Sequence, residues 1–208
     1  MAFFLETLIG GLMAGMLYSL VALGFVLIYK ATETVSFAQG DLMMLGGFFV
    51  FTFIGLIGLD YWLGFLFAVC GMAVFGMATE RILVRPILGY PQFSIVMATI
   101  GLGYFLRSIA GMIWGTDDLR IETPFSAGVL KVGDLVLAHD KLSVIVATVI
   151  LCAVLYAFFN YTRMGTAMRA TSENMLAAYY MGIPVKRVVS LIWAISAAVA
   201  ACAGVLLA

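Results

Sequence analysis

Six long apolar segments dominate this sequence and limit the folds that it can adopt. They are residues 8–29, 42–59, 61–79, 93–114, 142–162 and 188–208. A helix needs roughly 20 residues to cross a hydrocarbon layer of about 30 Å. Inside that layer only helices and closed barrels satisfy every backbone polar group, and the segments lack the alternation of barrel strands. The sequence therefore predicts an all-α, polytopic transmembrane helix bundle of about six spans, in one domain covering residues 1–208.

Composition supports a lipid environment. Hydrophobic residues make up 64% of the chain and charged residues 11%, against roughly 25% charged residues in a soluble domain. The formal net charge is zero, so no overall field favours nucleic acid as a partner. No basic residue precedes Lys30, whereas a cleavable signal has a positive start. We therefore expect the first apolar segment to be kept as a span.

The charges between the spans predict an orientation. Residues 163–187 contain four basic residues and one acidic residue, and such loops face the cytoplasm. Alternating crossings then place the N-terminus and residues 115–141 outside, where five acidic residues outnumber three basic ones. Within that external segment, residues 129–132 and 135–138 flank Gly133 and Asp134, a pair suited to a hairpin turn. A two-stranded hairpin and a solvated connection with local pairing both fit this pattern.

Residues suited to enzyme chemistry do not converge. The single histidine, His139, lies in the external acidic segment, and no serine has a nucleophile-elbow pattern. Carboxylates do not recur at metal-ligand spacing, and the three cysteines fall within apolar runs, where a thiol behaves as a small hydrophobe. We expect no catalytic residue, no metal and no cofactor.

The cytoplasmic segment 163–187 has the features of a docking element. Ser172 is suited to begin a helix, Gly182 to supply a left-handed exit, and Pro184 to prevent continuation. Residues 173–181 are thus predicted to form one short helix with an apolar stripe. The stripe consists of Met175, Leu176, Tyr179 and Tyr180.

Two polar features lie near or within the spans. Arg107 is in the outer third of the fourth span, where snorkelling or an interhelical bond is favoured over a substrate role. Residues 30–41 interrupt an apolar region with polar groups and Gly40. Such a stretch fits either a broken helix that lines a cavity or an ordinary cytoplasmic loop.

An ion-coupled carrier is expected to have ionisable residues in mid-span. The first, second, third, fifth and sixth apolar segments contain none within the limits given above. This absence favours an external energy source such as an ATPase. The last span also ends in ACAGVLLA without an interfacial anchor, so we expect the chain to be C-terminally truncated.

Two stretches resemble a known family. VALGFVLIYKATETVSFAQGDLMMLGGF (21–48) and TRMGTAMRATSENMLAAYYMGIPVKRV (162–188) are similar to permease subunits of bacterial ABC importers for branched-chain amino acids. The resemblance implies a permease domain in the bacterial inner (cytoplasmic) membrane. It also implies a second permease subunit, homologous or identical, cytoplasmic ATP-binding subunits, and a periplasmic or external solute-binding protein. Subunits of this family are longer, which agrees with a truncated C-terminus.

The resemblance also implies roles for particular residues. The candidate ATPase-coupling residues are Arg169, Ala170, Glu173, Asn174, Ala177, Ala178, Gly182 and Ile183. Importers at large have Glu-Ala-Ala followed three residues later by Gly, whereas Leu176 stands here in the glutamate position. The candidate translocation-path residues are Phe37, Ala38, Gly40 and Asp41, together with Arg107.

These observations lead to two functional hypotheses. The first is an ABC importer permease for branched-chain amino acids or related small solutes, with a coupling segment at residues 163–187. The second is an ATPase-independent channel or secondary transporter for small polar solutes such as urea or amides. An intramembrane enzyme is set aside because the sequence offers it no nucleophile and base.

Overall fold

The fold is a bundle of membrane-length helices, as predicted. The computed structural model describes residues 2–32, 35–87, 90–115, 129–132 and 135–207. Among these residues, six helices are long and apolar enough to cross a membrane. The α-helices are α1 (Ala2–Thr32), α2 (Gln39–Phe51), α3 (Tyr61–Thr79), α4 (Gln92–Trp114), α5 (His139–Tyr161), α6 (Arg163–Glu173), α7 (Met175–Tyr180) and α8 (Val185–Leu207). Two π-helical segments, η1 (Thr52–Leu56) and η2 (Glu80–Val84), extend α2 and α3, and the 3₁₀ turn η3 (Arg85–Ile87) follows η2.

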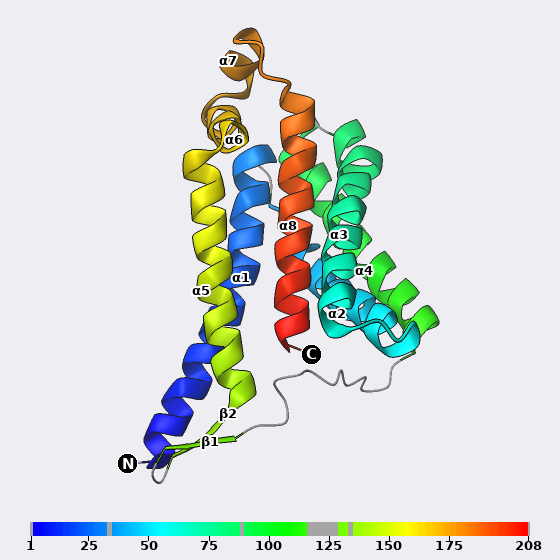
Figure 1. The fold of residues 1–208 in the computed structure, drawn as a ribbon. Coiled ribbons are helices and arrows are strands. Elements are labelled where there is room, and N and C mark those ends of the chain that lie inside the picture. The colour runs from blue at the N-terminus through cyan, green and yellow to red at the C-terminus, as the bar shows by residue number, and fades with distance from the viewer. Residues whose placement is uncertain (1, 33–34, 88–89, 116–128, 133–134, 208) are drawn as a thin grey trace.

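Helix α8 forms the centre of the bundle. It lies between α1 and α3 (Figure 1) and also packs against α2. Fourteen of its 23 residues are buried. Small residues allow α2 and α8 to approach each other closely. A Cβ atom at Gly46 of α2 would collide with Ala201, and one at Gly204 of α8 would collide with the backbone of Met43. Helix α8 is therefore in close contact with α2 along its C-terminal half.

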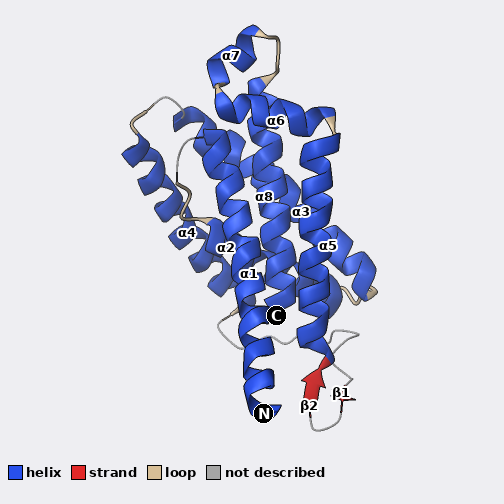
Figure 2. Ribbon diagram, turned by 90° about the vertical axis from the view of Figure 1, so that its left-hand side faces the viewer, coloured by secondary structure: helices blue, strands red, loops and turns tan. Residues whose placement is uncertain are grey.

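The two ends of the bundle carry different structures. Helices α6 and α7 lie at one end, whereas the N-terminus and the β1–β2 hairpin lie at the other (Figures 1 and 2). Strands β1 (Val129–Val132) and β2 (Leu135–Ala138) are antiparallel, with Val129 opposite Ala138. The hairpin interpretation of this segment is therefore confirmed, while its proposed turn, Gly133 and Asp134, falls outside the described residues. The predicted cytoplasmic and external segments are thus at opposite ends.

The second span is shifted toward the N-terminus and the third is longer than the sequence predicted, and this corrects one expectation. Helix α2 begins at Gln39 instead of residue 42, and α3 continues through η2 and η3 to Ile87. Asp41, Glu80 and Arg85 therefore lie within membrane-length helices. The predicted limits, 42–59 and 61–79, contain no ionisable residue, but they were wrong, and the spans of the structure do contain such residues. The physical reason is that each carboxylate has an arginine partner, so a charge need not mark the end of a span.

Candidate functional site

Helix α6 folds back against the end of α5. The Thr162 hydroxyl caps α6 by accepting a hydrogen bond from the Gly165 amide at 3.0 Å. Gly165 is buried against the backbone of Phe158 and Phe159, where a Cβ atom would not fit. The guanidinium of Arg169 donates to the Phe159 carbonyl and, at 2.7 Å, to Asn160 Oδ1. Arg169, a predicted coupling residue, thus holds α6 to α5.

The predicted helix over 173–181 is present as α7, but it begins only at Met175. Helix α6 ends at Glu173, and Asn174 adopts an extended conformation. The Asn174 side chain accepts a hydrogen bond from the Ala177 amide at 2.9 Å and so caps α7. Ser172, the expected cap, instead donates to the Arg169 carbonyl within α6. The sequence contained two suitable capping residues, and the prediction chose the wrong one.

The exit from α7 follows the prediction. Gly182 has φ +82°, a conformation that disfavours residues with a Cβ atom. Its amide donates to the Tyr179 carbonyl, and the Ile183 amide donates to the Ala178 carbonyl, both at 3.0 Å. Helix α8 begins directly after Pro184. The short helix α7 is therefore fixed at both ends.

Helix α7 lies at the tip of the molecule (Figure 1), and it exposes large apolar side chains. Ala178 is buried, whereas Leu176 is 70%, Tyr179 67%, Tyr180 83% and Met181 83% exposed. Leu176, Tyr179 and Tyr180 are spaced three and four residues apart on the helix, and we call these three residues the α7 apolar face; Met181 follows the helix. Of the other predicted coupling residues, Glu173, Asn174, Ala177 and Gly182 are exposed, while Ala170 and Ile183 are half-buried.

A second group of predicted residues lies where α1 and α2 are separated. Helix α2 occupies only the part of the bundle away from α7 (Figure 1). Ser36, Gln39 and Asp41 are buried, and the Phe37 amide donates to the Thr99 hydroxyl of α4 at 3.3 Å. Residues 30–41 were expected to form either a break between helices or an ordinary cytoplasmic loop, and in the structure they form a break inside the bundle. Buried polar groups line the end of this break.

Gln39 joins this break to the central helix. The Ser196 hydroxyl of α8 lies 3.1 Å from Gln39 Oε1 and 2.8 Å from the Gly24 carbonyl of α1. A Cβ atom at Gly24 would collide with the Gln39 amide group. Sequence reasoning missed Gln39 and Ser196. A serine within the apolar final span was the available indication.

The break also brings together Asp41 and Arg107. Arg107 Nη2 donates to Asp41 Oδ1 at 2.9 Å, so of the two alternatives favoured for Arg107, snorkelling and an interhelical bond, the structure has the bond. The Asp41 side chain is 11% exposed and that of Arg107 65%. Thr99, Gly103 and Arg107 recur every four residues on one face of α4, and a Cβ atom at Gly103 would collide with the Asp41 carboxylate. Among the other predicted path residues, Ala38 is buried, while Phe37 and Gly40 are exposed.

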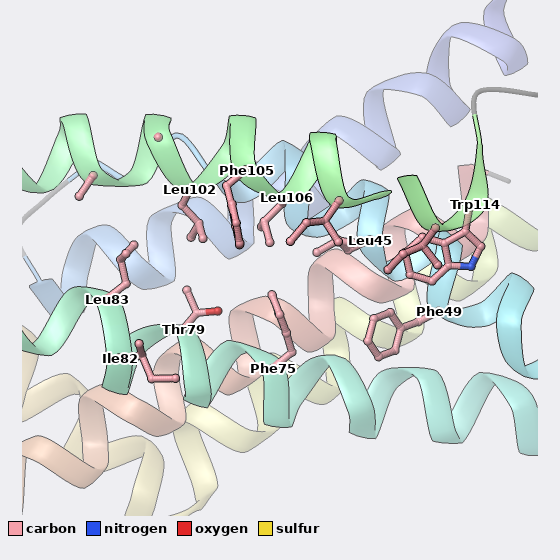
Figure 3. Close-up of a pocket in the computed structure, with 14 residues that line it drawn as sticks. Leu45, Phe49, Phe75, Thr79, Ile82, Leu83, Leu102, Phe105, Leu106 and Trp114 are labelled. Carbon is pink, nitrogen blue, oxygen red and sulfur yellow. The ribbon is translucent and has the colours of Figure 1, made fainter. Parts of the chain in front are cut away.

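An apolar cavity of about 720 Å³ lies between α2, α3 and α4 (Figure 3). Its lining includes Leu45, Phe49, Phe75, Leu102 and Phe105, with Thr79 contributing a hydroxyl group. Aliphatic and aromatic walls offer little to a charged solute. The polar break is therefore the better candidate for solute passage.

A polar break inside a bundle of membrane-length helices, combined with a capped helix that projects from one end, is typical of transport permeases. The chain belongs to the family described as "Branched-chain amino acid transport system / permease component", whose model matches residues 7–208.

Named relatives agree with this assignment. One relative is the high-affinity branched-chain amino acid transport system permease protein LivH of Escherichia coli (strain K12). It is 29% identical over an alignment of 223 residues, gaps included, that covers 99% of this chain and 70% of LivH. BraD of Pseudomonas aeruginosa, with the same description, is 27% identical over 216 residues, or 98% of this chain and 70% of BraD. A probable LivH of Methanocaldococcus jannaschii is 29% identical over 202 residues, or 95% of this chain and 64% of that protein. No solved structure matches the chain significantly.

Proposed function

We propose that this chain is the membrane-spanning permease subunit of an ABC importer for branched-chain amino acids or related small solutes. It works in the bacterial cytoplasmic membrane with a second permease subunit, cytoplasmic ATP-binding subunits and an external solute-binding protein. The printed names of LivH and BraD support the solute class. We assign the chain no enzymatic reaction.

The α7 apolar face is the observation that carries this proposal. Exposed apolar patches that are surrounded by polar residues mark interaction surfaces. A helix that binds in the groove of a partner is a common mode of protein recognition. Helix α7 projects beyond the bundle (Figure 1), so its face is not covered by the membrane-length helices. Caps at both ends hold this face in one orientation. The ATP-binding subunit is the proposed occupant.

The Asp41–Arg107 pair supports a solute path at the α1–α2 break. A charge inside the membrane costs about 2.5 kcal/mol or more, so an intramembrane pair is a functional candidate. The Arg107 side chain is largely uncovered by this chain. Exposure of the guanidinium group to hydrocarbon would be unfavourable, whereas water in a solute path would accept its hydrogen bonds.

Reconstitution tests the proposal. The permease, its partner permease, the ATP-binding subunits and the solute-binding protein are placed in liposomes, and leucine uptake is followed. We expect uptake only when ATP is present on the side of α7. Uptake that persists without ATP but with a sodium or proton gradient would instead support the ATPase-independent transporter.

A matched pair of variants tests the docking surface. Tyr180→Ala removes a side chain from the α7 apolar face, and Trp62→Ala removes a similarly exposed aromatic ring at the start of α3. We expect Tyr180→Ala to reduce recovery of the ATP-binding subunits with the purified permease by tenfold or more. Trp62→Ala should leave that recovery unchanged.

A further inference from the structure

A cluster of three polar side chains joins the end of α3 to the start of α8. Arg85 Nε and Nη2 donate to the two oxygens of Glu80 at 3.1 and 2.9 Å. Ser190 Oγ donates to Glu80 Oε2 at 2.6 Å and accepts from Arg85 Nη2 at 2.7 Å. Arg85 also reaches the Lys186 carbonyl in the first turn of α8. We call Glu80, Arg85 and Ser190 the α3–α8 clamp.

The clamp is specific in its geometry. Glu80 is 1% exposed, so its carboxylate has given up water and depends on these partners. The two parallel bonds from Arg85 fix the orientation of both groups. Ser190 completes the set by using its hydroxyl as both donor and acceptor. Loss of Arg85 or Ser190 leaves the buried Glu80 carboxylate with incomplete hydrogen bonding.

The position of the clamp connects it to α7. Helix α8 begins at Val185, directly after the Gly182–Pro184 exit from α7. The clamp bonds to the first two turns of α8, at Lys186 and Ser190. About 9 Å further along α8, Ser196 bonds to Gln39 at the α1–α2 break. One rigid helix thus has a polar attachment to α3 near the docking segment and another near the candidate path.

We propose that the α3–α8 clamp is a coupling device that makes α3 move together with α8 when α7 is displaced. The proposal rests on the proposed function, because it requires an ATP-binding subunit that displaces α7. Without the clamp, α8 would yield to α7 while α3 stays in place. ATP hydrolysis would then continue with little solute movement. Glu80, Arg85 and Ser190 are positioning residues in this account, and none of them needs to touch the solute.

The test compares Ser190→Ala with Thr52→Val in the reconstituted complex. Both remove one hydroxyl that links two elements, but the Thr52 hydroxyl accepts from Trp114 Nε1 and so joins η1 to the C-terminal end of α4, not α3 to α8. Leucine uptake and ATP hydrolysis are measured together with the melting temperature of each complex. We expect Ser190→Ala to lower uptake per ATP hydrolysed by fivefold or more while ATP hydrolysis stays within twofold of the unmodified complex. Thr52→Val should leave that ratio unchanged.

Three outcomes would contradict the proposed coupling role of the α3–α8 clamp. They are an unchanged ratio in Ser190→Ala, a parallel fall in uptake and hydrolysis, and an equal loss of the ratio in Thr52→Val. The milder substitution Arg85→Lys, which keeps the charge but loses the paired geometry, should give a reduced ratio in a complex that still assembles. An unmodified complex that takes up leucine without ATP would contradict the proposed function itself, whatever the variants do.

Discussion

Asp41 accepts a hydrogen bond from Arg107 at 2.9 Å although 66 residues separate them in the chain. The pair joins the first turn of α2 to the middle of α4. Helix α2 begins inside the bundle, so Asp41 in its first turn is close to Arg107. From the sequence, Arg107 was expected near the external surface. The break between α1 and α2 is therefore a site within the bundle, with two opposite charges at its end.

A double-mutant cycle on this pair has a definite expected result. Arg107→Gln leaves the buried Asp41 carboxylate without its ion pair, at a cost of about 1–3 kcal/mol. Asp41→Asn combined with Arg107→Gln removes the buried charge as well, so the double variant should regain part of the lost stability. Thermal unfolding of the purified permease measures this, and purely additive effects would show that the two residues are not coupled. Leucine uptake should fall in the double variant even though its stability recovers.

Gly103→Ala tests how closely the Asp41 carboxylate approaches α4. A Cβ atom at Gly103 would strike the carboxylate, whereas one at Gly101, two residues earlier, would meet nothing within 4 Å. Alanine is otherwise preferred over glycine within a helix by about 1 kcal/mol. We therefore expect Gly103→Ala to lower the melting temperature and leucine uptake, and Gly101→Ala to preserve both. Equal behaviour of the two variants would contradict the described packing.

Asn174→Ala tests the junction between α6 and α7. Removing the cap should destabilise α7 by about 1 kcal/mol and weaken recovery of the ATP-binding subunits. Ser172→Ala is the control, since its hydroxyl bonds within α6 and caps nothing in α7. If Ser172→Ala had the larger effect on this recovery, the single helix expected from the sequence would be the better description.

Gly182→Val tests the exit from α7. A β-branched residue at φ +82° costs roughly 1–2 kcal/mol, so the turn that links α7 to α8 should distort. We expect ATP hydrolysis to continue while leucine uptake decreases. Gly111→Val is the control, because that glycine has open space around it and a helical conformation. Normal uptake by Gly182→Val would show that this turn does not take part in coupling.

The helical spans were the most predictable part of the fold. Phe93–Trp114 agrees with the sequence prediction at both ends, the third span begins at Tyr61 as predicted but continues to Ile87, and the other spans differ by a few residues. The reason is physical, since a backbone in hydrocarbon has to satisfy its own polar groups and a run of apolar residues shows where it does so. The antiparallel pairing of 129–132 with 135–138 was one of two alternatives that the sequence left open.

Contacts between helices were not predictable from one sequence. Gln39 with Ser196, and Glu80 with Ser190, are pairs more than 100 residues apart. Each of these residues was visible as a polar side chain, but periodicity says which face a residue occupies and not which helix it meets. The boundary between α6 and α7 was missed for a local reason, because Ser172 and Asn174 are both good caps.

Site-specific photo-crosslinking tests the central claim most directly. A photo-reactive amino acid replaces Tyr180, which is 83% exposed on the α7 apolar face, and the assembled importer is irradiated in its membrane. The account predicts a covalent adduct between this position and the ATP-binding subunit, and none from the same probe at Trp62. An actively transporting complex that gives no adduct at position 180 would contradict it.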